Sequence, residues 1–167
     1  QAAGKSIMYM IEANPGAGLG VLSAYWAFSK DKRTKDSAPG AIIIHFFGGI
    51  HEIYFPYVLM NPIVIVASIA GSACAVFYYS LFNIGLTGPA SPGSIIAFLT
   101  MAPKGSTLAV LLGVVIAAAV SFLVAAPIIK MSNGKSLEEA SDSVQSMKAA
   151  SKGIAKTAGE IKKIVFA

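Results

Sequence analysis

The sequence predicts an all-α membrane protein with multi-pass helices and broken or re-entrant helical hairpins, followed by a cytosolic helical linker. Of its 167 residues, 55% are hydrophobic and only 13% are charged, and the mean hydropathy is +0.68. A soluble domain carries about 25% charged residues. Two uninterrupted apolar runs, residues 63–82 and 108–129, are each long enough to cross a hydrocarbon core of about 30 Å. We interpret both runs as transmembrane helices.

Three further apolar segments, residues 7–28, 41–60 and 84–103, are interrupted by proline, glycine and polar residues. Unwound backbone survives at membrane depth only where protein or a polar cavity satisfies it. The first segment is therefore either a kinked span or a re-entrant hairpin. The other two are expected to enter and leave on one face as hairpins. Within the last of them we expect a short helix from Ser94 to Met101, capped by Ser94 or Ser91.

The net charge of +5 is concentrated in the loop at residues 30–36 and in the tail from Lys130 onward. The positive-inside rule places such basic segments on the cytoplasmic side, and two full crossings put the loop and the tail on the same side. Nucleic-acid binding is the weaker interpretation, because no aromatic residues alternate with the lysines.

The tail predicts a change of domain. The pattern Ser136-Leu-Glu-Glu139 fits a capping box that opens a helix. We expect residues 1–130 to form part of a membrane-embedded domain, residues 131–160 to form a cytosolic linker, and residues 161–167 to be the first strand of a domain missing from the chain. Gln1 in place of an initiator Met also predicts a piece of a longer protein.

The ionisable residues inside the broken segments are the candidate functional residues. A carboxylate in hydrocarbon costs several kcal/mol, so it survives where it faces a cavity, has a partner or serves a function. Glu12 has Asn14 nearby, and Glu52 has His51 beside it. Carboxylate, amide and imidazole groups give the directed hydrogen bonds that a polyol or sugar needs. Aromatic neighbours are expected to wall such a site, namely Tyr54, Phe55 and Tyr57.

Other interpretations of these residues stay open. Glu52 is also a candidate for a structural ion pair with Lys104 or His45, and His45 fits a packing role. Glu12 and Glu52 together fit an ion-coupled secondary transporter or a channel. We predict no metal, because neither a His-x-x-x-His spacing nor a cysteine pair is present. We predict no cofactor either, because no strand precedes the glycine run at residues 16–20.

Three longer motifs resemble one family. GGIHEIYFPYVLMNP (residues 48–62), QAAGKSIMYMIEANPGAGLGVL (residues 1–22) and GPASPGSIIAFLTMAPKG (residues 88–105) closely resemble the membrane C domain of the mannitol-specific enzyme II of the bacterial phosphoenolpyruvate-dependent phosphotransferase system. The resemblance runs from Gln1 through Ile129 and weakly into the tail. It corresponds to the C-terminal half of that C domain plus the linker to the B domain.

The resemblance implies a homodimeric permease of the bacterial inner membrane, with a cytoplasmic tail. Its C domain binds mannitol or a related polyol and translocates it. A phosphocysteine B domain then phosphorylates the polyol, which makes the whole a protein-N(pi)-phosphohistidine–mannitol phosphotransferase. By motif match, Glu52 and Glu12 are the expected residues of substrate binding and translocation, and Asn14 and His51 assist them in binding substrate. Glu52 is also the catalytic candidate, because a carboxylate near the receiving hydroxyl can orient it or take its proton.

The chain departs from the family's pattern at its ends. The B-domain cysteine is absent, and Cys74 cannot replace it because we expect it to be buried within a predicted span. Several membrane helices that precede this region in the family are also absent. The chain alone is therefore expected neither to transport nor to phosphorylate.

Overall fold

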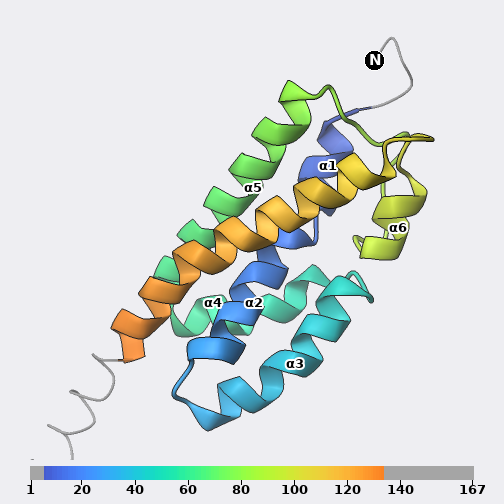
Figure 1. Cartoon of the computed structure of the whole chain (residues 1–167). Helices are drawn as coiled ribbons and strands as arrows, with labels where there is room; N and C mark the ends of the chain where they lie inside the picture. Colours follow the sequence, from blue (N-terminus) through green and yellow to red (C-terminus); the bar gives the residue numbers. More distant parts are fainter. Residues whose placement is uncertain (1–5, 134–167) are drawn as a thin grey trace, which may run out of the picture. The chain divides into compact units, whose positions relative to one another are not determined.

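The computed structural model of the chain describes residues 6–133. This part consists mainly of helices joined by turns and irregular segments. Extended pairing is limited there to one isolated bridge between Ser6 and Leu86. Nine helical elements follow one another (Figure 1): α1 Met8–Ala13, α2 Gly16–Phe28, α3 Lys32–Phe46, η1 His51–Tyr54, α4 Phe55–Met60, η2 Pro62–Val64, α5 Ile65–Leu81, α6 Ile95–Thr100, and a last helix, Thr107–Asn133. The expected all-α class is confirmed.

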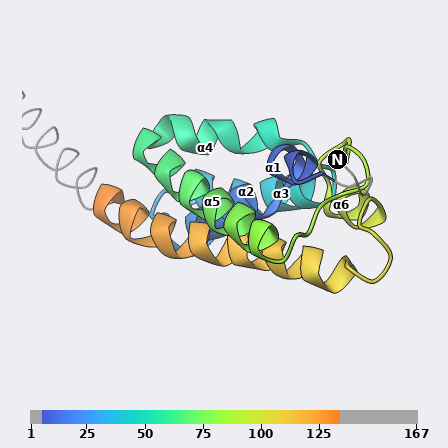
Figure 2. The same ribbon diagram turned by 90° about the horizontal axis from the view of Figure 1, so that it is seen from above.

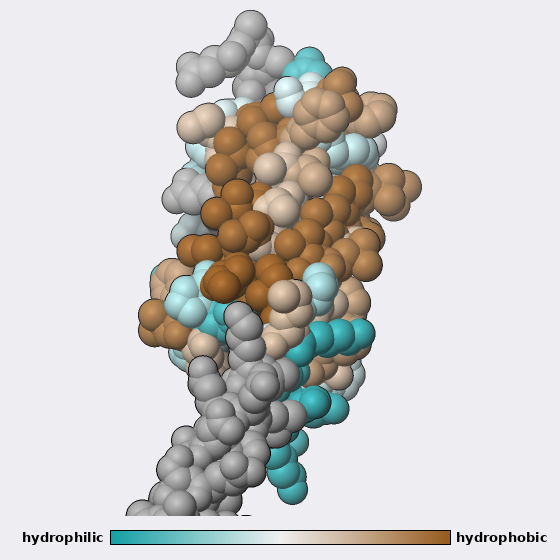
Figure 3. Space-filling model, turned by 90° about the vertical axis from the view of Figure 1, so that its left-hand side faces the viewer, coloured by the Kyte–Doolittle hydropathy of each residue, from teal (hydrophilic) through white to brown (hydrophobic). Residues whose placement is uncertain are grey.

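Two of these helices are long and apolar enough to cross a membrane. They are Pro62–Leu81, with 20 residues, and Thr107–Asn133, with 27 residues. Both predicted long apolar helices are thus found, and the second extends beyond its predicted end at residue 129. Only 33% of the most apolar stretch of each helix is buried inside the structure. The remainder presents apolar side chains outward (Figure 3), as a helix in contact with lipid does.

The two long helices pack antiparallel through buried polar contacts. The Tyr79 hydroxyl donates to the Val110 carbonyl at 3.0 Å, and the Ser121 hydroxyl donates to the Ala67 carbonyl at 3.0 Å. Between these bonds, a Cβ placed on Gly71 would overlap the Ser121 side chain and lie 2.5 Å from the Ala117 carbonyl. The absence of a side chain at Gly71 therefore lets the two helices approach closely.

We expect Gly71→Val to separate these helices and to destabilise the fold by about 1–3 kcal/mol. The measurement is thermal unfolding in detergent of the protein at its full natural length. Cys74→Val is the matched control, because Cys74 lies one turn further along α5 with an exposed side chain. If both variants unfolded at the same temperature, the inference that Gly71 permits close packing of the two helices would be wrong.

The first broken segment is a kinked helix that continues in one direction rather than a hairpin. Met10 and Ala13 of α1 share a buried cluster with Tyr79, whereas Leu22 of α2 shares one with Val64. Together α1 and α2 therefore follow α5 along its length, in the opposite direction. The helix is interrupted at Asn14-Pro15, which we call the break, because proline has no backbone N–H to donate.

The second broken segment folds into a hairpin, which we call the first hairpin: α3 runs in one direction, and η1 and α4 return beside it. The Ser37 and Tyr57 hydroxyls lie 2.9 Å apart across it, and the Thr34 hydroxyl approaches the Met60 sulfur at 3.6 Å. Figures 1 and 2 show α2 between this hairpin and the pair formed by α5 and the last helix. The tip of the first hairpin is residues 47–50.

The predicted loop at residues 30–36 is wrong in part, because α3 begins at Lys32 and continues through Pro39. The reason is the cap at Asp31. Its carboxylate accepts hydrogen bonds from the Thr34 backbone N–H at 2.9 Å and from the Thr34 hydroxyl. These bonds hold the pKa of the Asp31 carboxyl below its ordinary value. A strong cap thus starts the helix ahead of its apolar part.

The third broken segment also turns back on itself, and we call residues 84–103 the second hairpin. The backbone N–H and the hydroxyl of Thr87 both donate to the Met101 carbonyl at 2.9 Å, which closes its base. The expected short helix is α6, and the Ser94 side chain caps it by accepting from the Ala97 N–H at 3.2 Å. The tip of this hairpin is residues 89–93.

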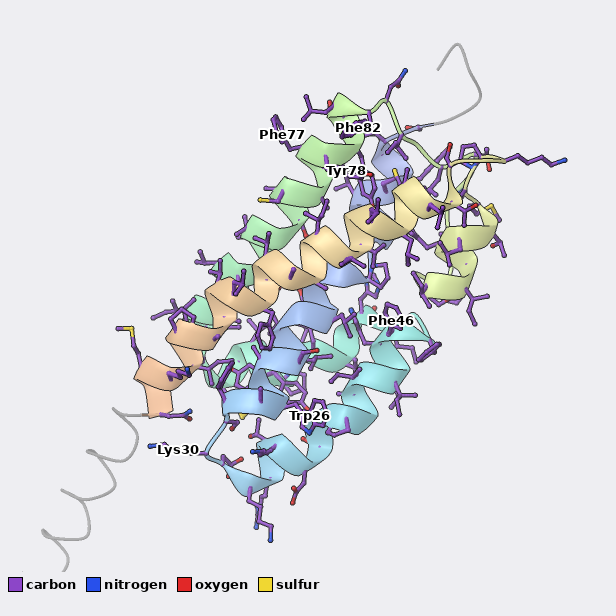
Figure 4. All side chains as sticks on the ribbon, in the orientation of Figure 1. Trp26, Lys30, Phe46, Phe77, Tyr78 and Phe82 are labelled. Atoms are coloured by element: carbon purple, nitrogen blue, oxygen red, sulfur yellow. The ribbon has the colours of Figure 1, made fainter. Side chains whose placement is uncertain are left out.

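Most of the described charged residues lie toward one end of the bundle. Lys130 places its Nζ 4.3 Å from the centre of the Phe28 ring, so the end of α2 and the start of α3 lie beside Lys130. This confirms that the basic residues at 30–35 and Lys130 lie at one end. Figure 4 shows Lys30 and Trp26 toward this end and Phe82 at the opposite end of α5.

One further expectation needs correction. Cys74 lies mid-span as predicted, but its side chain is exposed on the outer face of α5 instead of buried. The predicted capping box at 136–139, the rest of the linker and the strand at 161–167 lie outside the described residues.

Candidate functional site

Three irregular segments from different parts of the chain meet beside one polar pocket. They are the break in the first segment, the tip of the first hairpin and the tip of the second hairpin. The two hairpins start from opposite ends of the bundle, so their tips meet within it. The pocket has a volume of about 270 Å³ and is lined by Tyr9, Ala13, Gly49, His51, Glu52, Pro89, Ala90, Ser91, Pro92 and Gly93.

The two hairpin tips touch through glycines. Gly49 has a φ of +72°, and a Cβ there would lie 2.5 Å from the Ser94 nitrogen and 2.9 Å from the Gly93 nitrogen. A Cβ on Gly93 would lie 2.8 Å from His51 Nε2. Only glycine combines a left-handed conformation with so close an approach of two backbones. These positions thus allow the tips to close around the pocket.

His51, the first residue of η1, connects the first hairpin to the tip of the second by a hydrogen bond. Its Nε2 lies 3.0 Å from the Gly93 carbonyl oxygen. A carbonyl can only accept, so Nε2 carries the proton, and in the neutral ring Nδ1 is an acceptor. His51 therefore holds the pocket wall together and keeps one ring nitrogen for another hydrogen bond.

Glu52 brings a carboxylate to the pocket. It lies in the first turn of η1 and is exposed, and it lines the pocket beside His51. Among the described residues it forms no ion pair, neither with Lys104 nor with His45. Lys104 lies beyond the second hairpin and is exposed. The structure therefore favours a carboxylate available to a ligand over a structural ion pair.

The two other predicted site residues lie at the break. The Asn14 Oδ1 accepts from the Gly16 N–H at 2.9 Å, so this side chain supports the start of α2 and does not line the pocket. Glu12 belongs to α1 next to Ala13, which does line the pocket. The Glu12 side chain lies outside the described part, and its role stays a prediction.

The expected aromatic wall is wrong. Tyr57 turns toward Ser37 inside the first hairpin, Tyr54 meets the His45 ring edge-on at 6.0 Å, and Phe55 is exposed. Because η1 and α4 wind helically, these neighbours of Glu52 in the sequence point to other faces. Tyr9 supplies the aromatic side chain instead. Tyr9 precedes Ala13 by four residues, or about one helical turn. This spacing in the sequence indicates that both side chains lie on one face of the helix.

Ser91 is a second pocket residue that sequence reasoning did not select. It belongs to the Ser91-Pro92-Gly93 turn, which the sequence marked as an interruption, with Ser91 as a candidate helix cap rather than a binding residue. Among residues 6–133, no group of three or more His, Cys, Asp or Glu side chains is placed to hold a metal ion. The pocket thus offers a carboxylate, an imidazole and hydroxyl groups, which suit a ligand rich in hydroxyls.

Broken helices and hairpin tips that converge on a polar pocket, beside helices long enough to span a membrane, are typical of membrane transport proteins with a site at the helix interruptions. Comparisons with known proteins agree. Residues 2–72 match the family model described as "Phosphotransferase system, EIIC".

Curated relatives extend this match over nearly the whole chain. The chain is 56% identical over 147 residues to the "PTS system mannitol-specific EIICB component" of Bacillus subtilis (strain 168), which covers 87% of the chain and 30% of that protein. It is 53% identical over 172 residues to the EIICBA component of Vibrio cholerae, covering 98% of the chain and 26% of the relative. It is 55% identical over 153 residues to the EIICBA component of Escherichia coli (strain K12), covering 90% of the chain and 24% of the relative.

The chain therefore belongs to the EIIC family, the membrane component of the phosphotransferase system. It spans between 24% and 30% of the length of the relatives described above. No solved structure matches it.

Proposed function

We propose that this chain is part of a permease that binds mannitol in the polar pocket and delivers it for phosphorylation during uptake. The observation that carries this proposal is that α1, just before the break, and both hairpins converge on a pocket lined by Glu52 and His51. The similarity to proteins named as mannitol-specific components selects the substrate. We further propose that the protein is a multi-pass homodimer of the bacterial inner membrane. Its basic end and its tail then lie in the cytoplasm.

The polyol is recognised through its hydroxyl groups. The Glu52 carboxylate accepts hydrogen bonds from two hydroxyls, and His51 Nδ1 accepts from a third. The Ser91 hydroxyl either donates or accepts, and the Tyr9 ring provides a surface for the carbon chain. We propose that Glu12, next to the pocket-lining Ala13, and Asn14 support binding from the break.

Phosphorylation follows at the cytoplasmic face. The B domain presents a phosphocysteine, the polyol oxygen attacks its phosphorus, and the sulfur–phosphorus bond breaks to release the thiolate. The hydroxyl proton passes to the Glu52 carboxylate as the oxygen–phosphorus bond forms. Because phosphoryl transfer depends mainly on positioning and charge, the main role of Glu52 is to orient the attacking hydroxyl.

The test is uptake of labelled mannitol by membrane vesicles that contain the protein at its full natural length together with the soluble phosphotransfer proteins. We expect mannitol phosphate to accumulate only with phosphoenolpyruvate, and not with a proton or sodium gradient. Uptake of free mannitol driven by an ion gradient would contradict the proposal and support an ion-coupled transporter that uses Glu12 and Glu52.

A further inference from the structure

His45 is a buried polar residue just outside the pocket. It lies in the last turn of α3 with 1% of its surface exposed, and it is not among the pocket-lining residues. Its ring packs directly on Gly18 of α2, where a Cβ would overlap the imidazole. Burying a polar ring is costly unless its nitrogens find partners. The hydrogen bonds and packing contacts of the buried His45 ring therefore indicate its structural role.

The ring is anchored to the break through one nitrogen. His45 Nε2 donates to the Pro15 carbonyl oxygen at 3.0 Å. In the neutral ring Nδ1 is then an acceptor, and it is buried with no hydrogen-bond partner among the described residues. The bond to Pro15 orients the ring, and it ties the end of α3 to the break.

On its other side the same ring contacts the pocket wall. The His45 and His51 ring centres lie 4.7 Å apart, with their planes at 38°. His51 in turn donates to Gly93 in the second hairpin. One continuous series of contacts therefore runs from Pro15 through His45 and His51 to Gly93. It joins all three irregular segments around the pocket.

We propose that His45 is a positioning residue of the polyol site: anchored to Pro15, it holds the His51 ring in the orientation that keeps Nδ1 available to the ligand. This inference rests on the proposed polyol site. A ring that is already oriented loses less freedom when the ligand binds, which strengthens binding without any contact between His45 and the ligand.

The first test is a double-mutant cycle on the dissociation constant for labelled mannitol, with the protein at its full natural length in membranes. His45→Phe keeps an aromatic ring and removes the donor to Pro15, and we expect about tenfold weaker binding. In a His51→Ala background, the same change is expected to have an effect of less than about twofold, because the ring to be positioned is gone. Additive effects would overturn the proposal.

Tyr79→Phe is the matched control. It also removes one buried hydrogen bond of 3.0 Å to a backbone carbonyl, but Tyr79 is not among the pocket-lining residues. We expect it to lower thermal stability about as much as His45→Phe and to leave mannitol binding unchanged. If it weakened binding equally, the effect of His45 would be one of stability alone, and the proposal would fail.

A second measurement separates this inference from the proposed function. In protein labelled with ¹⁵N-histidine, the resonances missing from His51→Ala identify His51. We expect His45→Phe to shift the His51 ring nitrogens in the absence of any polyol. An unchanged His51 spectrum would refute the positioning role. Failure of the unmodified protein to bind mannitol would instead refute the proposed function and leave this spectral test standing.

Discussion

We expect Glu52→Gln to weaken mannitol binding by about a hundredfold or more. The substitution keeps the size of the side chain but replaces a charged acceptor of two hydroxyls with a neutral amide. Hydrogen bonds to a charged group contribute about 1.5–3 kcal/mol each, and losing one such bond lowers affinity by about ten- to a hundredfold. The measurement is equilibrium binding of labelled mannitol to membranes that contain the protein at its full natural length.

Asp36→Asn is the matched control for this variant. Asp36 is an exposed carboxylate in α3, near the base of the first hairpin and away from the pocket. We expect its replacement to leave mannitol affinity within about twofold of the unmodified protein, as surface charges contribute little. Full affinity in Glu52→Gln would exclude Glu52 from the binding site.

We expect Gly49→Ala to abolish mannitol binding and to destabilise the protein by about 2–4 kcal/mol. The left-handed backbone conformation at φ +72° costs an L-residue about 1–2 kcal/mol. The new Cβ would also lie 2.5 Å from the Ser94 nitrogen, so the hairpin tips must separate. Separation displaces His51 from Gly93 and opens the pocket. Mannitol binding and thermal unfolding in detergent check both effects.

Gly105→Ala isolates the contribution of backbone strain. Gly105 also has a positive φ, +87°, but a Cβ there would meet no atom within 4 Å. We expect this variant to lose about 1–2 kcal/mol of stability and to bind mannitol normally. If Gly49→Ala behaved like Gly105→Ala in both measurements, contact between the two tips would not matter for binding.

The helices that follow from local pattern were predictable from the sequence. Long apolar runs without charge identified both spans, since each satisfies its backbone internally while its side chains face lipid. Pro15 identified the break, and Ser94 identified the start of α6, because each acts on the backbone of its immediate neighbours. The start of α3 did not follow from the apolar pattern, because the first turns of this helix are polar and only the local cap at Asp31 marks its beginning.

The candidate site was predictable only in part. Glu52 and His51 were identified because a carboxylate is rare in an apolar segment, whatever the fold. Asn14 lies at the break but not in the pocket, and Tyr9 and Ser91 were missed. A side chain lines a pocket according to the direction it takes from its helix and according to which other segments pack opposite it. Contacts between segments that are distant in the sequence cannot be predicted from the residues of either segment alone.

By itself, the sequence determined that this protein is helical and apolar, where its helices break and which carboxylates need explanation. Those properties arise from hydropathy and from backbone effects that extend over a few residues. Only the tertiary structure decided that the first segment is a kinked helix and that two hairpin tips meet at its break. It also decided that His45 joins Pro15 to His51. These results depend on packing between segments about 30 or more positions apart, where glycines permit the approach and single hydrogen bonds set the geometry.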